Sequence, residues 1–288
     1  MTSARVLLRA ARPRQWPKNV LVLAAPAAAG IVHQPQEALQ ASVAVLAFVL
    51  ASSGVYLAND VVDIEADRAH PTKRHRPVAS GELPVRDARV AAAVLLAAGL
   101  LVAALLAWQL LVVVALYEGL QFLYSVRLKH VPLIELICVA SGFLLRAVAG
   151  GAATGIGLTV WFVGAVSFGA LFVVAGKRYS ERLLAEEATP AIRPVLARYS
   201  ASYLRFVWTL SAAVVVATYA LWAAVGGQAA LNSWAVASVL PFTVAVLWYA
   251  VKVDAGGAGE PEEVFLHDGM LQLLLVVWAG CFLGSVYL

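Results

Sequence analysis

The chain has 288 residues, of which 62% are hydrophobic and only 13% are charged. This composition excludes an ordinary soluble globular protein, which needs more polar surface to cover its core, and predicts an all-α integral membrane protein. A formal net charge of +4 says little about nucleic acid, because topology and anionic membrane lipids account for a basic face on such a protein, and we expect no nucleic-acid partner. No cleavable leader pattern precedes the first apolar run, so we expect that run to be retained.

Polar breaks divide the apolar sequence into nine predicted transmembrane helices, since each needs about 20 mostly apolar residues to cross a bilayer core. The expected spans are Trp16–Val32, Leu39–Ala58, Asp87–Trp108, Gln109–Val126, Pro132–Gly151, Leu158–Gly176, Ser202–Val225, Ser233–Val251 and Gly269–Tyr287. The third and fourth spans adjoin almost without a loop, which would make them an αα-hairpin with a very short turn.

The basic residues predict how these spans are oriented. With nine spans, nearly all lysines and arginines fall on one face, which the positive-inside rule makes cytoplasmic. Only Arg146, inside the fifth span, is left over, and the loops of the opposite face carry one formal charge, Glu37. An even number of spans would scatter the basic loops over both faces. We therefore expect a multi-pass protein of the plasma membrane with a cytoplasmic N-terminus.

An acidic cluster follows the second predicted span, in the stretch NDVVDIEADRAHPTKRHRPVASG at residues 59–81. If the helix continues past its apolar run, Asn59, Asp63 and Asp67 recur at i, i+4 and i+8 and project along one stripe, with Asp60 next to Asp63 at i+3. Stacked carboxylates repel one another, and a helix C-terminus disfavours negative charge further. A cation must therefore offset them.

Two kinds of cation fit. Local salt bridges to Arg68, Lys73 and Arg74 are one interpretation. The other is a Mg²⁺ site with Asn59, Asp60, Asp63 and Asp67 as the candidate ligands, completed by water and substrate phosphate. The basic run Lys73, Arg74 and Arg76 favours the second, because arginine grips phosphate with two hydrogen bonds and lysine acts as a point charge. Acid for metal and base for phosphate predict a magnesium diphosphate ligand, the leaving group of transferases that release pyrophosphate.

These residues resemble the first signature of the UbiA superfamily of intramembrane prenyltransferases, NDxxDxxxD followed by a basic PxKRxRP run. The likeness extends to RPRQWPKN at residues 12–19, where Lys18 and Asn19 resemble a pair on the family's first helix. The resemblance implies nine helices around a central cavity open to the cytoplasm, with Mg²⁺ near its mouth. It further implies one membrane domain over residues 1–288, capped at the active site by loops 59–86 and 177–201.

The sequence departs from the family pattern after the sixth predicted span. Ordinary members carry a second aspartate-rich motif there, whereas this chain reads GKRYSERLLAEE, with Lys177, Arg178, Tyr179 and Glu181. Positive charges in place of acidic ones suit an additional phosphate rather than a second metal site. This pattern resembles the decaprenyl-phosphate phosphoribosyltransferase branch of the superfamily, as do YSVRLKH, IELICVASGFLLRAVAGG, SYLRFVWTLSA and GEPEE.

This second resemblance implies transfer of a phosphoribosyl group from phosphoribosyl diphosphate to decaprenyl phosphate, a membrane lipid, with a product that serves cell-wall arabinan synthesis. Asn59, Asp63 and Asp67 are then the expected catalytic and metal-binding residues, with Asp60 as a further ligand. The expected substrate contacts are Lys18, Asn19, Lys73, Arg74, Arg76, Tyr124, Lys129, Arg146, Lys177, Arg178, Tyr179 and Glu181.

Several alternatives stay open. Arg146 either meets the lipid phosphate or pairs with Glu118 or Gln121 across the bundle, and Lys129 either contacts phosphate or anchors its helix at the membrane surface. A conventional prenyltransferase with an aromatic acceptor is the nearest rival function, although the basic GKRYSE segment argues against it. A transporter would place ionisable groups near the bilayer midplane, whereas almost every charge here lies at one face.

Overall fold

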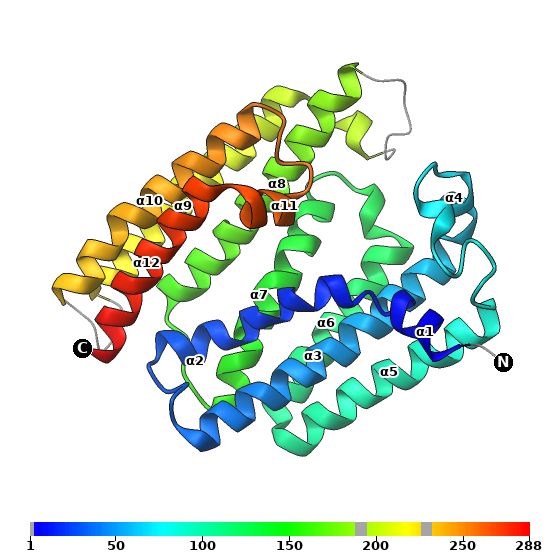
Figure 1. Cartoon of the computed structure of the whole chain (residues 1–288), viewed down its shortest axis with the longest axis horizontal. Coiled ribbons are helices and arrows are strands. Elements are labelled where there is room, and N and C mark those ends of the chain that lie inside the picture. The colour runs from blue at the N-terminus through cyan, green and yellow to red at the C-terminus, as the bar shows by residue number, and fades with distance from the viewer. Residues whose placement is uncertain (1–2, 188–194, 226–231) are drawn as a thin grey trace. The chain divides into compact units, whose positions relative to one another are not determined.

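The apolar runs of the chain form long helices, as the all-α prediction requires. The computed structural model describes residues 3–187, 195–225 and 232–288, and in these ranges every regular element is helical (Figure 1). The chain divides into two units. Unit 1 contains Met1–Ala27, Ile31–Lys129 and Leu145–Ile156, and unit 2 contains Ala28–Gly30, His130–Leu144 and Gly157–Leu288. The single membrane domain expected from the sequence stays a prediction.

The helices follow the predicted order with changed boundaries. Before residue 130 the chain forms α1 (Ala4–Ala10), the 3₁₀ helix η1 (Pro13–Leu23), α2 (Ala24–Ala28), α3 (Pro35–Val62), α4 (Ile64–Ala69), the 3₁₀ helix η2 (Lys73–His75), α5 (Val85–Leu106) and α6 (Trp108–Val126). The remainder forms η3 (Leu128–His130), α7 (Ile134–Thr154), α8 (Val160–Glu187), η4 (Leu196–Arg198), α9 (Ala201–Val225), α10 (Ser233–Asp254), α11 (Pro261–His267) and α12 (Gly269–Tyr287). The two units share α7.

Eight helices in the described ranges are long and apolar enough to cross a membrane: α3, α5, α6, α7, α8, α9, α10 and α12. They correspond to eight of the nine predicted spans. The first predicted span, Trp16–Val32, differs, because the 3₁₀ helix η1 with Pro17 inside it is followed by the five-residue α2. These 11 and five residues still rise about 30 Å, since a 3₁₀ helix rises ~2.0 Å per residue and an α-helix ~1.5 Å. The ninth crossing and the central cavity stay predictions.

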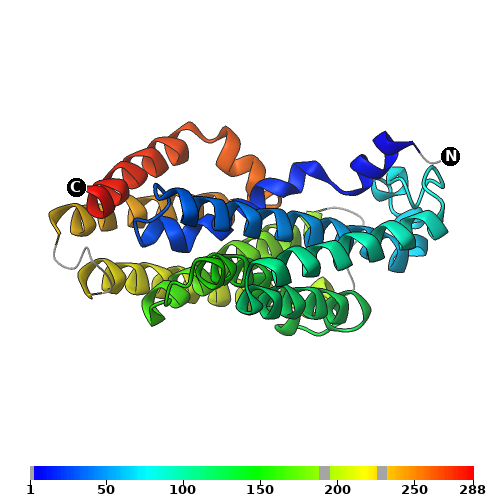
Figure 2. The same cartoon turned by 90° about the horizontal axis from the view of Figure 1, so that it is seen from below.

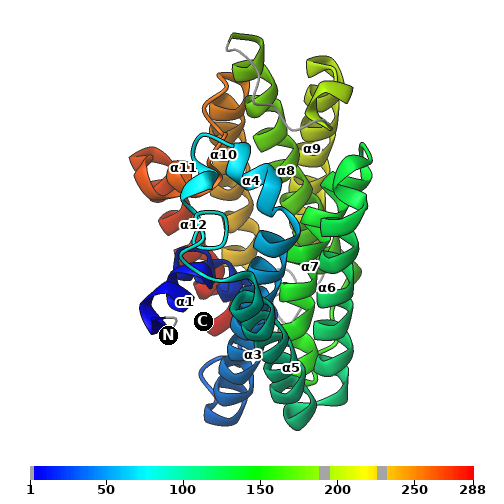
Figure 3. The same ribbon diagram turned by 90° about the vertical axis from the view of Figure 1, so that its right-hand side faces the viewer.

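Unit 1 is built around α3, which lies beside α5 in Figures 1 and 3. A Cβ atom added at Gly99 of α5 would lie 3.1 Å from the carbonyl oxygen of Ala47 in α3, so a small residue permits this close approach of helix backbones. Ala107, in an extended conformation, alone separates α5 from α6. The short-turn hairpin predicted at this boundary is therefore confirmed.

Unit 2 pairs α8 with α9 and α10 with α12 (Figures 1 and 2). A cluster of buried aromatic rings joins α8, α9 and α10, in which Phe172 meets Trp208 and Tyr249. Of the predicted loop 177–201, the segment Lys177–Glu187 instead continues α8, and residues 188–194 lie outside the described residues. That prediction was wrong because the apolar run ends at Gly176, whereas the polar residues beyond it are good helix formers held by contacts to neighbouring helices.

Candidate active site

The signature residues lie where α3 passes into α4. Helix α3 runs to Val62 and α4 begins at Ile64, with Asp63 between them. Helix-type hydrogen bonds continue through this junction, because the N–H of Asp63 donates to the carbonyl of Asn59 at 2.9 Å and that of Asp67 to the carbonyl of Asp63 at 2.8 Å. The predicted stripe of Asn59, Asp63 and Asp67 is therefore kept across a local departure from helical geometry.

Asp60 and Asp67 are the shielded carboxylates, with side chains 2% and 4% exposed. One guanidinium nitrogen of Arg76 lies 3.2 Å from Asp60 Oδ1 and 2.6 Å from Asp67 Oδ2. Arg12 also pairs with Asp60, and its guanidinium lies 5.1 Å from the ring centroid of Tyr56. Because buried carboxylates need charged partners, the two arginines tie the N-terminal segment and the basic loop to the end of α3.

Arg12 makes its contacts from a left-handed backbone conformation, with φ = 55°. A non-glycine residue in this region carries about 1–2 kcal/mol of strain. The ion pair with Asp60 and the stacking on Tyr56 offset that strain. Arg12 stands in the quoted RPRQWPKN motif but was not among the predicted site residues, since sequence gives no signal for which of its basic side chains turns toward the carboxylates.

Asp63 is the accessible carboxylate of the group. Its side chain is 34% exposed and pairs with Lys129, which is 22% exposed. Asn59 accepts a hydrogen bond from the hydroxyl of Ser125 in α6, a residue that sequence reasoning missed. We call Asn59, Asp60, Asp63, Asp67, Arg12, Arg76 and Lys129 the charged cluster. All of it lies in unit 1, and its three carboxylates are balanced by three basic side chains.

The donor set of the charged cluster fits Mg²⁺. Within the ranges the structure describes, no three His, Cys, Asp or Glu side chains converge on one point. The aspartates do form ion pairs, but with Arg12, Arg76 and Lys129 rather than with the predicted Arg68, Lys73 and Arg74. However, Mg²⁺ takes only one or two carboxylates from a protein and fills its other positions with water and substrate phosphate. Asp63 and Asp67, with the amide oxygen of Asn59, supply such hard oxygen ligands on one stripe.

The other predicted contacts of unit 1 lie at varied depths. Lys73 is half-buried and Arg74 is exposed on η2, ahead of the Arg76 pair, and Lys18 and Tyr124 are half-buried on η1 and α6. Arg68, the remaining residue of the salt-bridge interpretation, pairs with Glu65 rather than with the signature aspartates. These placements leave the substrate roles of the basic residues as predictions.

Arg146 and Asn19 form a buried polar network within unit 1. Both are at most 5% exposed. The Nε–H of Arg146 donates to Asn19 Oδ1 at 2.8 Å, and its Nη2 donates to the hydroxyl of Tyr117 at 3.0 Å. Asn19 in turn donates to Ser52. The network links η1, α3, α6 and α7. A role of Arg146 at the lipid phosphate, or its pairing with Glu118 or Gln121, stays a prediction.

The GKRYSE residues lie together in unit 2, on one stretch of α8. Arg178 is 4% exposed and grips the fully buried Glu135 with Nε at 2.9 Å and Nη2 at 3.0 Å, while its Nη1 donates to Glu181 at 2.9 Å. Lys177 Nζ lies 3.9 Å from Glu181 and remains 34% exposed. Arg178 thus holds two carboxylates, and Lys177 is the more accessible cation.

Tyr179 is buried and hydrogen-bonded within the protein. It is 1% exposed and accepts a hydrogen bond from Arg205 of α9 through its hydroxyl. Nearby, the hydroxyl of Tyr199 accepts a bond from the N–H of Leu133 at 2.6 Å, and burial raises the pKa of Tyr199 to about 12. Glu135 and Arg205 were missed from the sequence, because each is recognised only by the partner that the fold brings to it.

Comparisons with known proteins find relatives that match nearly the whole chain. The chain is 47% identical over 293 residues to the decaprenyl-phosphate phosphoribosyltransferase of Mycolicibacterium smegmatis, covering 98% of this chain and 92% of the relative. It is 50% identical to the Mycobacterium tuberculosis protein with the same name, covering 94% and 91%. A UbiA homolog from Archaeoglobus fulgidus bound to DMAPP and Mg²⁺ shares the fold, with a TM-score of 0.71, 20% identity and coverage of 98% and 97%. Since residues 20–274 also match the family profile, the chain belongs to the UbiA prenyltransferase family.

Proposed function

We propose that this protein transfers the 5-phosphoribosyl group of phosphoribosyl diphosphate to decaprenyl phosphate, releasing pyrophosphate and forming phosphoribosyl-phosphoryl-decaprenol. The observation that carries the proposal is the charged cluster at the end of a membrane-spanning helix, where carboxylates and basic side chains alternate within contact distance. Such a cluster suits a ligand that brings both a divalent cation and phosphate. The two mycobacterial relatives named decaprenyl-phosphate phosphoribosyltransferase, which match nearly the whole chain, support the same reaction.

The chemistry needs no general base. A phosphate monoester is largely ionised at neutral pH, since its second pKa is about 6, so an oxygen of the acceptor can attack C1 of the ribose directly. The new C1–O bond to the lipid phosphate forms as the C1–O bond to the diphosphate breaks, and the diphosphate leaves with the bonding electrons. The protein therefore acts through positioning and through stabilisation of the departing charge.

Within the charged cluster, Asp63 and Lys129 are the pair that exchange partners. Both are partly exposed, so the ammonium group of Lys129 can turn from Asp63 to a diphosphate oxygen when the donor binds. Arg76 stays on the shielded Asp60 and Asp67 and fixes their oxygens. Asn59, Asp63 and Asp67 would hold Mg²⁺, which neutralises charge on the leaving diphosphate. The Mg²⁺-bound relative of known structure supports this use of a metal.

We assign the phosphate contact that distinguishes this donor to the GKRYSE motif. Lys177 is the candidate ligand for the 5-phosphate, because it is the accessible cation of the GKRYSE motif. Arg178 acts on it indirectly by holding Glu181 in place. The basic residues around both motifs favour a cytoplasmic site at the cell membrane, where soluble phosphoribosyl diphosphate is met and where the lipid product enters cell-wall arabinan synthesis.

The test is transfer by purified protein in detergent with phosphoribosyl diphosphate, Mg²⁺ and decaprenyl phosphate, measured as pyrophosphate release and as labelled lipid product. Asp63→Asn and Lys177→Ala should each lower kcat/KM by about 100-fold, the scale of lost metal or oxyanion contacts. Glu37→Gln removes a half-buried carboxylate from the first turn of α3, at the end of the helix away from the charged cluster. It is the matched control and should leave the rate unchanged. Consumption of a prenyl diphosphate with an aromatic acceptor, without phosphoribosyl transfer, would overturn the proposal.

A further inference from the structure

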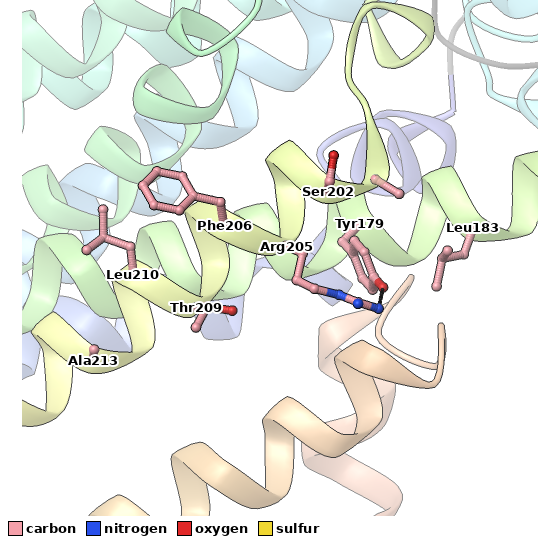
Figure 4. Close-up of a pocket in the computed structure, with 9 residues that line it drawn as sticks. Tyr179, Leu183, Ser202, Arg205, Phe206, Thr209, Leu210 and Ala213 are labelled. Carbon is pink, nitrogen blue, oxygen red and sulfur yellow. Dashed lines mark hydrogen bonds between the residues drawn. The ribbon is translucent and has the colours of Figure 1, made fainter.

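A cavity of about 610 Å³ lies on unit 2 between α8 and α9, outside the residues assigned to the reaction except for Tyr179 (Figure 4). Its lining includes Tyr179 and Leu183 of α8 and Arg205, Phe206, Leu210 and Ala213 of α9. The apolar α9 members Phe206, Leu210 and Ala213 follow one another at spacings of four and three residues, which places them on one side of the helix, with Arg205 directly before Phe206. The cavity is therefore a groove that follows α9.

One end of the groove is polar. Arg205 is the fifth residue of α9, and its side chain is 58% exposed. Figure 4 shows it turned toward Tyr179, whose hydroxyl accepts from Nη2. The same nitrogen lies 3.1 Å from Asp254. The Nε and Nη1 donors of Arg205 make no hydrogen bond to any residue in the described ranges. Ser202, one turn earlier on the groove wall, has its hydroxyl 3.1 Å from that of Ser200.

The rest of the groove is apolar and open to its surroundings. Phe206 is 61% exposed and Leu210 is 47% exposed, although both belong to a membrane-spanning helix. From Ser202 to Ala213 the groove follows α9 for about 16 Å, at ~1.5 Å per residue. This matches the depth of one hydrocarbon leaflet, half of a bilayer core of about 30 Å. A guanidinium thus sits where a lipid headgroup lies, and an apolar channel runs where its chain lies.

We infer that this groove binds an anionic glycerophospholipid, with a phosphate oxygen on Arg205 and an acyl chain along Phe206, Leu210 and Ala213. The Nε–H and Nη1–H groups of Arg205 lie on different edges of the guanidinium, and each can donate to a phosphate oxygen as a charge-assisted hydrogen bond. A groove that opens toward the bilayer meets bulk phospholipid far more often than a scarce lipid substrate. Asp254 disfavours the site electrostatically, because its carboxylate competes with the lipid phosphate for the same guanidinium. The inference is independent of the proposed transfer reaction.

Native mass spectrometry of the delipidated full chain, titrated with phosphatidylglycerol or phosphatidylcholine, tests the site. We expect one tight phosphatidylglycerol per chain, with affinity about tenfold lower in Arg205→Ala, which corresponds to about 1.4 kcal/mol. Arg89→Ala is the matched control, since Arg89 is an exposed fifth residue of another membrane-spanning helix, and it should bind as the wild type does. Asp254→Asn should bind phosphatidylglycerol more tightly.

A second variant separates binding from misfolding. Ala213→Phe fills the apolar end without changing charge, and it should lose the tight lipid while its thermal unfolding in detergent stays close to that of the wild type. Equal binding of the two lipids, equal loss in Arg205→Ala and Arg89→Ala, or a dimer that excludes lipid from this face would each overturn the inference. Selective binding of decaprenyl phosphate over phosphatidylglycerol would also overturn it.

Discussion

The buried ion pair of unit 2 allows a quantitative test of what Arg178 does. Glu135 is completely buried, Arg178 is 4% exposed, and two guanidinium nitrogens meet the carboxylate at 2.9 and 3.0 Å. Arg178→Met leaves Glu135 buried without its cation, and Glu135→Leu removes the buried carboxylate while the ion pair of Arg178 with Glu181 stays. The double variant removes both charges and fills the space with apolar atoms of similar size.

The expected magnitudes differ sharply between these variants. Removing one partner of a buried ion pair costs about 3–5 kcal/mol, whereas replacing the whole pair by apolar side chains is often neutral or stabilising. For a unit of 150–250 residues, 1 kcal/mol shifts Tm by about 2–4 °C. Each single variant should therefore lower Tm by about 6–20 °C, and the double variant should recover most of that loss.

Thermal unfolding in detergent, followed by tryptophan fluorescence, measures these shifts. Arg9→Met is the control, because the Arg9–Glu82 pair is 55% and 43% exposed and such surface pairs contribute about 0–1 kcal/mol. A single Arg178→Met variant with the wild-type Tm would refute the reasoning. A double variant as unstable as the singles would do the same, because it would show that the lost stability does not come from an uncompensated buried charge.

Two further predictions concern packing and pH. Gly150→Ala should lower Tm by several degrees, because the added Cβ would collide with the Val22 carbonyl oxygen and overpacking costs about 1–3 kcal/mol. Gly119→Ala is the control, since Gly119 has open space around it, and it should not lower Tm. The hydrogen bond from Lys252 lowers the pKa of Asp268 from 3.8 to about 2. The stability that this carboxylate contributes is thus complete above about pH 4 and lost as the pH falls toward 2, so the Tm difference between wild type and Asp268→Asn should shrink over that interval.

Helix positions were predictable because apolar runs of bilayer length carry a strong signal. The segment Trp16–Val32 is the informative exception. Its mean apolarity suits a membrane helix, but Pro17 stands inside it and removes a backbone donor, so the chain takes a 3₁₀ path that a count of apolar residues does not reveal. The predicted C-terminus of α8 was wrong for the opposite reason. The apolar run ends at Gly176, but the polar residues after it continue the helix to Glu187.

For the site, sequence indicated which residue types gather but not which contacts they make. The spacing of Asn59, Asp63 and Asp67 placed them on one stripe, and the structure keeps that stripe. The partners of the carboxylates come from distant segments: Lys129 lies 66 residues from Asp63, and Arg12 lies 48 residues from Asp60. Spacing rules act within one helix, so the local salt bridges considered from sequence named neighbouring cations and missed distant ones.

Burial divides the charged cluster into two parts with different consequences for catalysis. Asp60 and Asp67 are nearly closed to solvent and share Arg76, so their charges are compensated before any ligand arrives. Asp63 and Lys129 are partly exposed, and an exposed ion pair is weak enough to be broken by a ligand that offers each partner a stronger one. A donor carrying a cation and a diphosphate offers both. In the proposed reaction, the exposed pair would therefore exchange partners with the donor and its cation, while Arg76 keeps the oxygens of Asp60 and Asp67 in place.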